Sequence, residues 1–163
     1  MILLNGYELT LGEVVKVARE YEEVQLSEAG MSQLAASRAI VDKVLDEENP
    51  VYGISTGFGD FSRVFISKDQ REKLQRNLIL SHAAGVGEKL PEDVVRAAML
   101  LRANSLSKGY SGIKPSTVSM LLEMLNRRVY PGGALQRLSR SEWGFVPSFS
   151  YGAGHDGRRA SFC

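Results

Sequence analysis

The sequence predicts a mainly α-helical fold with short extended segments and an irregular tail. Three observations lead to this prediction. Apolar residues recur at helical spacing in several stretches, helix-start signals precede those stretches, and both patterns stop after Pro131. The chain has 163 residues, 44% of them hydrophobic, which is enough to bury a core.

The first fifty residues predict two helices and two extended segments. Thr10 and Glu13 have the spacing of a capping box. The apolar stripe that follows is Leu11, Val14, Val15, Ala18 and Tyr21. A second helix begins at Ser27 and ends near Asn49, because Pro50 disfavours helical backbone in the residue before it. Its stripe is Met31, Leu34, Ala35, Arg38, Val41 and Leu45, with Arg38 as the polar exception. Residues 2–4 and 24–26 are the extended segments.

Residues 51–62 predict a loop, and three more helices follow it. The loop contains Gly53, Gly57 and Gly59 and has neither helical nor strand periodicity. The next helix runs from a capping box at 67–70 to a cap at residue 85. Another begins at Pro91 and continues to Arg102, and the last runs from residue 115 to 127–128.

Composition excludes several classes of function. The formal net charge is +1, so no overall field favours nucleic acid or an anionic membrane. No apolar run is long enough to span a membrane or to form a signal peptide, and we therefore expect a cytoplasmic protein. Cys163, His82 and His155 are too few soft ligands for a structural zinc site, so we expect no metal.

Tyr52, at the front of the glycine loop, is the candidate general base. A tyrosine can take a proton when positive charge or hydrogen bonds lower its pKa from the usual value of about 10. The glycines would let this flexible loop close over a ligand. Taken alone, Tyr52 fits a packed ring at a turn better. A phosphate-binding loop is a poor alternative, because no Lys-Ser/Thr pair follows the glycines.

His82 lies late in the predicted third helix, between small residues that permit close approach of a ligand. A single helical histidine is more often a surface or satisfied core residue. Ser81 is its neighbour, but adjacent helical side chains diverge by about 100°, which argues against a nucleophilic pair. Arg102, Asn104 and Lys108 form a polar cluster before the Gly109–Gly112 turn, and for Lys108 a solvated charge is the better interpretation.

Three segments, taken together, resemble successive blocks of the aromatic amino acid ammonia-lyases. They are Val-Tyr-Gly-Ile-Ser-Thr-Gly-Phe-Gly (51–59), Leu-Gln-Arg-Asn-Leu-Ile-Leu-Ser-His-Ala-Ala-Gly (74–85) and Arg-Ala-Asn-Ser-Leu-Ser-Lys-Gly-Tyr-Ser-Gly (102–112). Their order and spacing also agree with the family. The resemblance runs from Ile2 to about Pro131, and the second block looks most like the bacterial histidine-specific branch.

This resemblance implies a fold, a reaction and roles for individual residues. The fold would be the N-terminal part of the fumarase/aspartase-like helical fold, in a family of homotetramers. Tyr52 would be the catalytic base at the β-carbon, and His82 would bind the imidazole of L-histidine, which the family converts to urocanate and ammonia. The family needs no external cofactor, because its methylidene-imidazolone electrophile forms from an internal Ala-Ser-Gly.

The chain departs from the family after Pro131. No Ala-Ser-Gly occurs in it, and residues 132–163 hold six of the 16 glycines but only three residues from Leu, Ile and Val. With suitable synonymous codons, a one-nucleotide shift through Glu142–Phe145 reads Ser-Gly-Ala-Ser. We therefore divide the chain into a lyase-like region, 1–131, and a non-homologous tail, 132–163, for which a change of reading frame is the hypothesis.

The sequence thus predicts a truncated histidine ammonia-lyase that is inactive alone. Two alternatives stay open. One is a non-catalytic helical fragment that associates with lyase subunits or with itself through exposed apolar faces. The other is a fragment of a phenylalanine- or tyrosine-specific lyase.

Overall fold

The computed structural model describes residues 1–47, 50–52, 54–57, 66, 70, 73–74, 76–77, 80 and 88–130. The chain forms two units, Met1–Asp46 with Pro91–Tyr130 and Glu47–Leu90 with Pro131–Cys163, and each is treated by itself. The first unit contains the strands and helices whose bounds follow. The predicted tail, 132–163, lies outside the described residues.

The first unit confirms the predicted mainly helical fold. Its helices are α1 (Leu11–Glu20), α2 (Glu28–Asp46), α4 (Glu92–Leu106) and α5 (Pro115–Asn126). The Thr10 capping box opens α1 as predicted, with Thr10 Oγ1 accepting from the Glu13 N–H at 3.3 Å and Glu13 accepting from the Thr10 N–H at 2.8 Å. In the predicted helix over 67–85, positions 70, 73, 74, 76, 77 and 80 are helical, and the other positions lie outside the described residues.

The two predicted extended segments pair as β1 (Ile2–Leu4) and β2 (Val24–Leu26) in a parallel sheet, with Ile2 opposite Val24. Asn126 of α5 covers the other edge of β2. Its side chain accepts from the Val24 N–H at 3.1 Å and donates to the Val24 carbonyl at 2.9 Å, as a neighbouring strand would. The sheet is thereby joined to α5.

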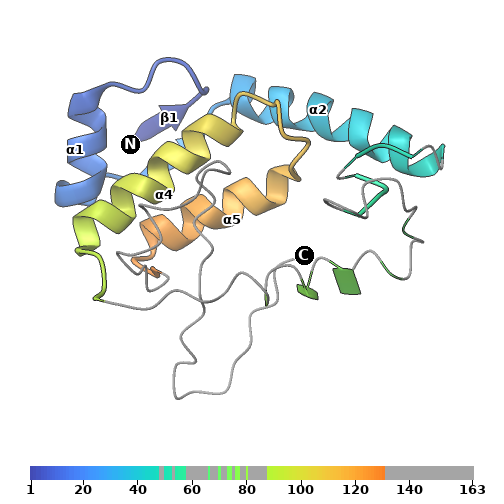
Figure 1. The fold of residues 1–163 in the computed structure, drawn as a ribbon. Helices are drawn as coiled ribbons and strands as arrows, with labels where there is room; N and C mark the ends of the chain where they lie inside the picture. Colours follow the sequence, from blue (N-terminus) through green and yellow to red (C-terminus); the bar gives the residue numbers. More distant parts are fainter. Residues whose placement is uncertain are drawn as a thin grey trace. The chain divides into compact units, whose positions relative to one another are not determined.

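Helix α4 lies between α1 and α5 (Figure 1) and contributes much of the core. The buried apolar side chains of α4 and α5 are Val95, Met99, Leu100, Ala103, Leu106, Val118, Leu122 and Leu125. The predicted stripe of α1 is wrong in part: Leu11 is 80% exposed and Val15 also faces solvent, whereas Val17 is fully buried. The face of α1 that is buried is decided by its contact with α4, which the local sequence does not encode.

The largest fully buried side chain belongs to Arg96, on α4, and it is 1% exposed. Its guanidinium donates to the Val17 carbonyl from Nε at 3.0 Å and from Nη2 at 2.6 Å, and to the Leu125 carbonyl at 3.1 Å. It also donates to the Tyr130 hydroxyl. Val17 belongs to α1 and Leu125 to the last turn of α5, so the partial negative charges of two helix ends face the buried cation.

Both helix ends carry a non-glycine residue in left-handed backbone, Tyr21 at φ 60° and Arg128 at φ 58°. Two guanidinium groups lie over the Tyr21 ring, with the Arg96 Cζ 4.4 Å and the Arg128 Cζ 4.1 Å from the ring centroid. Tyr21, predicted within the helical stripe, therefore ends α1 instead. We call Arg96, Tyr21, Arg128 and Tyr130 the Arg96 cluster, and it joins α1, α4 and α5.

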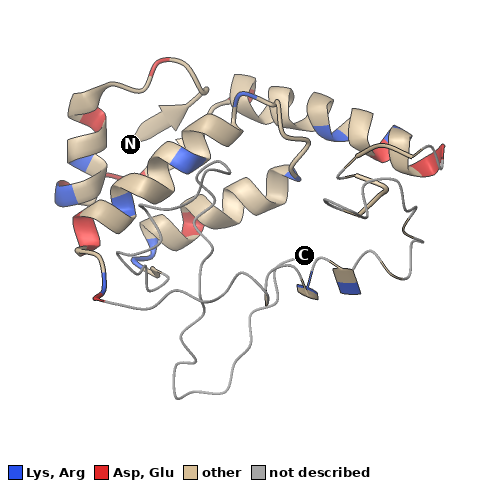
Figure 2. Ribbon diagram, viewed as in Figure 1, with Lys and Arg blue, Asp and Glu red and all other residues tan. Residues whose placement is uncertain are grey.

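Charges of both signs occur on each of α1, α2 and α4 (Figure 2). Among the described residues, no helix is long and apolar enough to cross a membrane. Within the same part of the chain, no three His, Cys, Asp or Glu side chains gather where they could hold a metal ion.

Candidate active-site turn around Tyr52

Val51, Tyr52, Ile54 and Ser55 belong to a closed turn, here called the Tyr52 turn. The Val51 carbonyl accepts from the Ile54 N–H at 3.1 Å and from the Ser55 N–H at 3.0 Å. In return, the Val51 N–H donates to Ser55 Oγ at 2.8 Å. Small hydroxyl residues often hold turns in this way, because the side-chain oxygen substitutes for a backbone acceptor.

The Tyr52 turn separates its residues by exposure. Tyr52 is 60% exposed, whereas Ser55 is 0% exposed and the adjacent Thr56 is also buried. Thr56 Oγ1 donates to the Gly57 carbonyl at 3.1 Å, and Gly57 is buried. The two hydroxyl residues are therefore enclosed, whereas Tyr52 is largely exposed to solvent.

Of the predicted site residues, the structure describes Tyr52 and Gly57. His82, Gly53 and Gly59 lie outside the described residues, so their predicted roles stay predictions. Sequence reasoning missed Ser55 and Thr56. The available signal was two adjacent hydroxyl residues directly before a glycine, a pattern typical of side chain-to-backbone bonds in turns.

The predicted polar cluster near Gly109–Gly112 is a packed corner in the first unit. Gly109 and Gly112 have φ of 76° and 64°, and a Cβ at Gly109 would lie 2.6 Å from the Gln33 carbonyl oxygen. Gly112 donates its N–H to Ser37 Oγ at 3.0 Å, and its carbonyl accepts from Arg38 at 3.3 Å. Glycine is required here because the backbone of the turn lies directly against α2.

Lys108, in this corner, is not the fully solvated charge that the sequence indicated. Its stem fills the space beside Gly6, where a Cβ would lie 2.6 Å from Lys108 Cγ. Its Nζ lies 5.3 Å from the centroid of the Tyr7 ring. The Tyr7 and Tyr110 hydroxyl oxygens are 3.3 Å apart, and this hydrogen bond raises the pKa of the Tyr7 phenol. The corner therefore joins the start of the chain to the end of α4.

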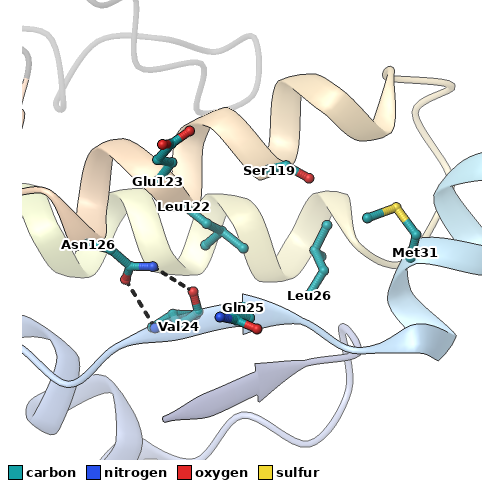
Figure 3. Close-up of a pocket in the computed structure, with 8 residues that line it drawn as sticks. All are labelled: Val24, Gln25, Leu26, Met31, Ser119, Leu122, Glu123 and Asn126. Carbon is teal, nitrogen blue, oxygen red and sulfur yellow. Dashed lines mark hydrogen bonds between the residues drawn. The ribbon is translucent and has the colours of Figure 1, made fainter.

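A groove of about 360 Å³ lies between β2 and α5 (Figure 3). Its lining residues come from β2, the start of α2 and α5, and are Val24, Gln25, Leu26, Met31, Ser119, Leu122, Glu123 and Asn126. The two hydrogen bonds between Asn126 and Val24 close one end of it. Tyr52 and Gly57, the predicted site residues that the structure describes, do not line this groove.

The comparisons with known proteins place the chain in a family. The family described as Aromatic amino acid lyase matches residues 9–132. The chain belongs to the aromatic amino acid lyases. It is 55% identical over 130 residues to the histidine ammonia-lyase of Alkaliphilus metalliredigens, a match that covers 80% of this chain and 26% of that protein. The chain thus spans about a quarter of the length of the curated relatives it matches.

Solved structures agree with this assignment. A histidine ammonia-lyase from Trypanosoma cruzi superposes with a TM-score of 0.71 at 37% identity, covering 77% of this chain and 24% of that one. The tyrosine aminomutase from Streptomyces globisporus superposes with a TM-score of 0.76 at 32% identity, covering 82% and 25%. The predicted fold, the N-terminal part of the ammonia-lyase helical fold, is therefore confirmed.

The electrophile of this lyase family needs no external cofactor, because it is made from the protein's own Ala-Ser-Gly. The 163 residues of this chain contain no such triplet.

Proposed function

We propose that residues 1–131 are the N-terminal region of a histidine ammonia-lyase and that this chain binds L-histidine without converting it. The observation that carries the proposal is identity of 50–55% to curated histidine ammonia-lyases over about 130 residues. Homo-oligomerisation and a cytoplasmic location belong to the same proposal.

In a complete lyase that carries the electrophile, Tyr52 would be the base. Its phenol oxygen would take a proton from the β-carbon of L-histidine, while the amino group leaves the α-carbon as ammonia and a double bond forms to give urocanate. The exposure of Tyr52 supports this role, because a base must reach the proton that it removes. His82 would contact the substrate imidazole, and Gly53, Gly57 and Gly59 would let the loop adjust around the substrate.

Turnover needs more than a base, because a β-proton is weakly acidic and an amine is a poor leaving group. Since this chain has no Ala-Ser-Gly, we expect binding without chemistry. The test is calorimetric titration of the purified 163-residue chain with L-histidine, together with the ultraviolet absorbance of urocanate. Binding without urocanate supports the proposal. Urocanate formation would contradict the proposal that the chain is inactive. Absence of binding would contradict the proposed function.

The rival within the family is a tyrosine- or phenylalanine-specific protein. Its support is the superposition on tyrosine aminomutase. Specificity for a substrate with polar ring nitrogens requires polar partners, which an apolar ring does not satisfy. The variant His82→Leu should lose L-histidine binding and gain L-tyrosine or L-phenylalanine binding. If wild-type protein prefers these amino acids to L-histidine, the rival is correct.

A non-catalytic partner of lyase subunits is the second candidate function. It is favoured by large apolar side chains that face solvent on four helices, namely Leu11, Ile40, Leu101 and Met120. Co-purification with a full-length lyase supports it. Elution as a monomer from a mixture with that lyase contradicts it.

We also propose that residues 132–163 arose by a change of reading frame. The end of the family match at residue 132 supports this origin. Sequencing the coding DNA tests it. The proposal fails if the alternative frame encodes no lyase-like continuation.

A further inference from the structure

Ser55 forms hydrogen bonds within the Tyr52 turn through both its backbone and its side chain. Its N–H donates to the Val51 carbonyl at 3.0 Å, and its Oγ accepts from the Val51 N–H at 2.8 Å. Its own carbonyl accepts from the Ile66 N–H at 2.9 Å. One fully buried residue therefore holds both polar backbone groups of Val51 and ties the turn to a second segment.

We propose that Ser55 is the positioning residue for Tyr52, an inference that rests on the proposed role of Tyr52 as base. Tyr52 directly follows Val51, so the bonds from Ser55 fix the backbone from which the phenol projects. The phenol oxygen lies at the far end of the ring. A change of about 10–20° in the direction of the side chain therefore exceeds the tolerance of a productive site.

The serine hydroxyl has a specific role in this arrangement. Alanine would occupy nearly the same buried volume but would leave the Val51 N–H without its acceptor. Such a turn can reopen toward water, because each remaining backbone bond contributes only a small net stabilisation. Thr56 is different, since its hydroxyl donates to the Gly57 carbonyl outside the Tyr52 turn. Positioning of Tyr52 is thus assigned to Ser55, whose bonds to Val51 close the turn.

The test uses the full 163-residue chain with ring-labelled tyrosine, observed by NMR. The six tyrosines give six signals, and Tyr52→Phe identifies that of Tyr52. In Ser55→Ala the Tyr52 signal should move to the position found in an unstructured peptide. Affinity for L-histidine should fall about tenfold, as expected when one substrate hydrogen bond is lost. The signals of Tyr21 and Tyr130, held by Arg96 in the other unit, should not move.

Ser107→Ala is the matched control. Ser107 is also 0% exposed, and its Oγ donates to the Asn104 carbonyl at 2.8 Å, but it lies in the first unit. This variant should leave the Tyr52 signal and the affinity for L-histidine unchanged. Ser55→Thr, which retains the hydroxyl, should restore both readouts.

The outcomes separate this inference from the proposed function. An unchanged Tyr52 signal in Ser55→Ala overturns the positioning role. If the wild-type chain does not bind L-histidine but Ser55→Ala still shifts the Tyr52 signal, the proposed function fails and the positioning role stands. Shifts of the Tyr21 and Tyr130 signals in Ser55→Ala would mean that this variant disturbs the whole chain. The test then uses Ser55→Thr, which keeps the hydroxyl. A displaced Tyr52 signal in Ser55→Thr overturns the inference.

Discussion

Arg96 and Ser55 are both buried polar residues that satisfy backbone groups, but they do so over different distances along the chain. Arg96 lies 79 residues from Val17 and 29 from Leu125, the residues whose carbonyls it binds. The side chain of Ser55 bonds a backbone N–H only four residues away. Arg96 therefore joins three helices, whereas Ser55 shapes one turn.

This difference separates contacts that stabilise the whole fold from contacts that set the geometry of the candidate site. A buried guanidinium without its carbonyl partners would be a desolvated charge, so the Arg96 cluster forms only together with the packed helices. The Tyr52 turn can form from local bonds and can adjust without unfolding the helices. We expect long-range polar contacts to control the free energy of unfolding, and local ones to control the geometry of small segments.

The largest loss of stability is expected for Arg96→Ala. The carbonyls of Val17 and Leu125 would lose a charged donor, and a large cavity would remain. By analogy with broken buried charge contacts, the free energy of unfolding should fall by about 3–5 kcal/mol. Urea denaturation followed by circular dichroism measures it. Arg19→Ala is the control, because the exposed Arg19–Asp93 pair should contribute at most about 1 kcal/mol. Equal losses of unfolding free energy in both variants would contradict the stabilising role assigned to the buried contacts of Arg96.

The next effect concerns the corner of the first unit. Gly112→Ala places a methyl group 2.3 Å from Val41 Cγ2 and in left-handed backbone. The backbone alone should cost about 1–2 kcal/mol, and the clash adds to that cost. Gly12→Ala is the control: it lies within α1 with no neighbour within 4 Å, and should gain about 0.5–1 kcal/mol. Thermal unfolding should therefore shift in opposite directions, and a shift in the same direction would contradict the structure.

A smaller effect is expected for the local cap of α1. Thr10→Ala removes the hydroxyl that accepts from the Glu13 N–H, and should cost about 1 kcal/mol. Thr10→Ser retains the oxygen and should stay within a few tenths of a kcal/mol of wild type. Chemical denaturation distinguishes the two variants. If Thr10→Ala costs as much as Arg96→Ala, the division between local and long-range contacts is wrong.

The smallest effect is a dependence on pH. Hydrogen bonds from the Thr10 N–H and hydroxyl hold the pKa of the Glu13 carboxyl below its ordinary value of 4.5. A carboxyl with a lowered folded pKa stabilises the fold above its unfolded pKa, and that contribution is lost as pH falls through the folded pKa. Glu13→Gln should therefore flatten the fall in melting temperature below about pH 4.5. Parallel curves for variant and wild type would show that this bond does not form in solution.

Local patterns carried most of the correct predictions. The capping box at Thr10, the proline at the start of α5 and the positions of β1 and β2 depend on residues close together in sequence, and each is confirmed. The exposed face of α1 was not predictable in the same way, because helical spacing does not say which neighbour a helix contacts. The role of Tyr52 came from the family blocks, and its exposure came from the structure.

By itself, the sequence determined the helical class, the helix starts, the membership of the lyase family and the absence of an Ala-Ser-Gly. Only the tertiary structure decided that a charged residue, Arg96, is fully buried and that Tyr21, which ends α1, and Arg128, just beyond the end of α5, adopt left-handed backbone. The physical reason is distance along the chain. Caps and turns are fixed by neighbours within a few residues, whereas a buried charge is tolerated only when the folded chain brings distant carbonyls to it.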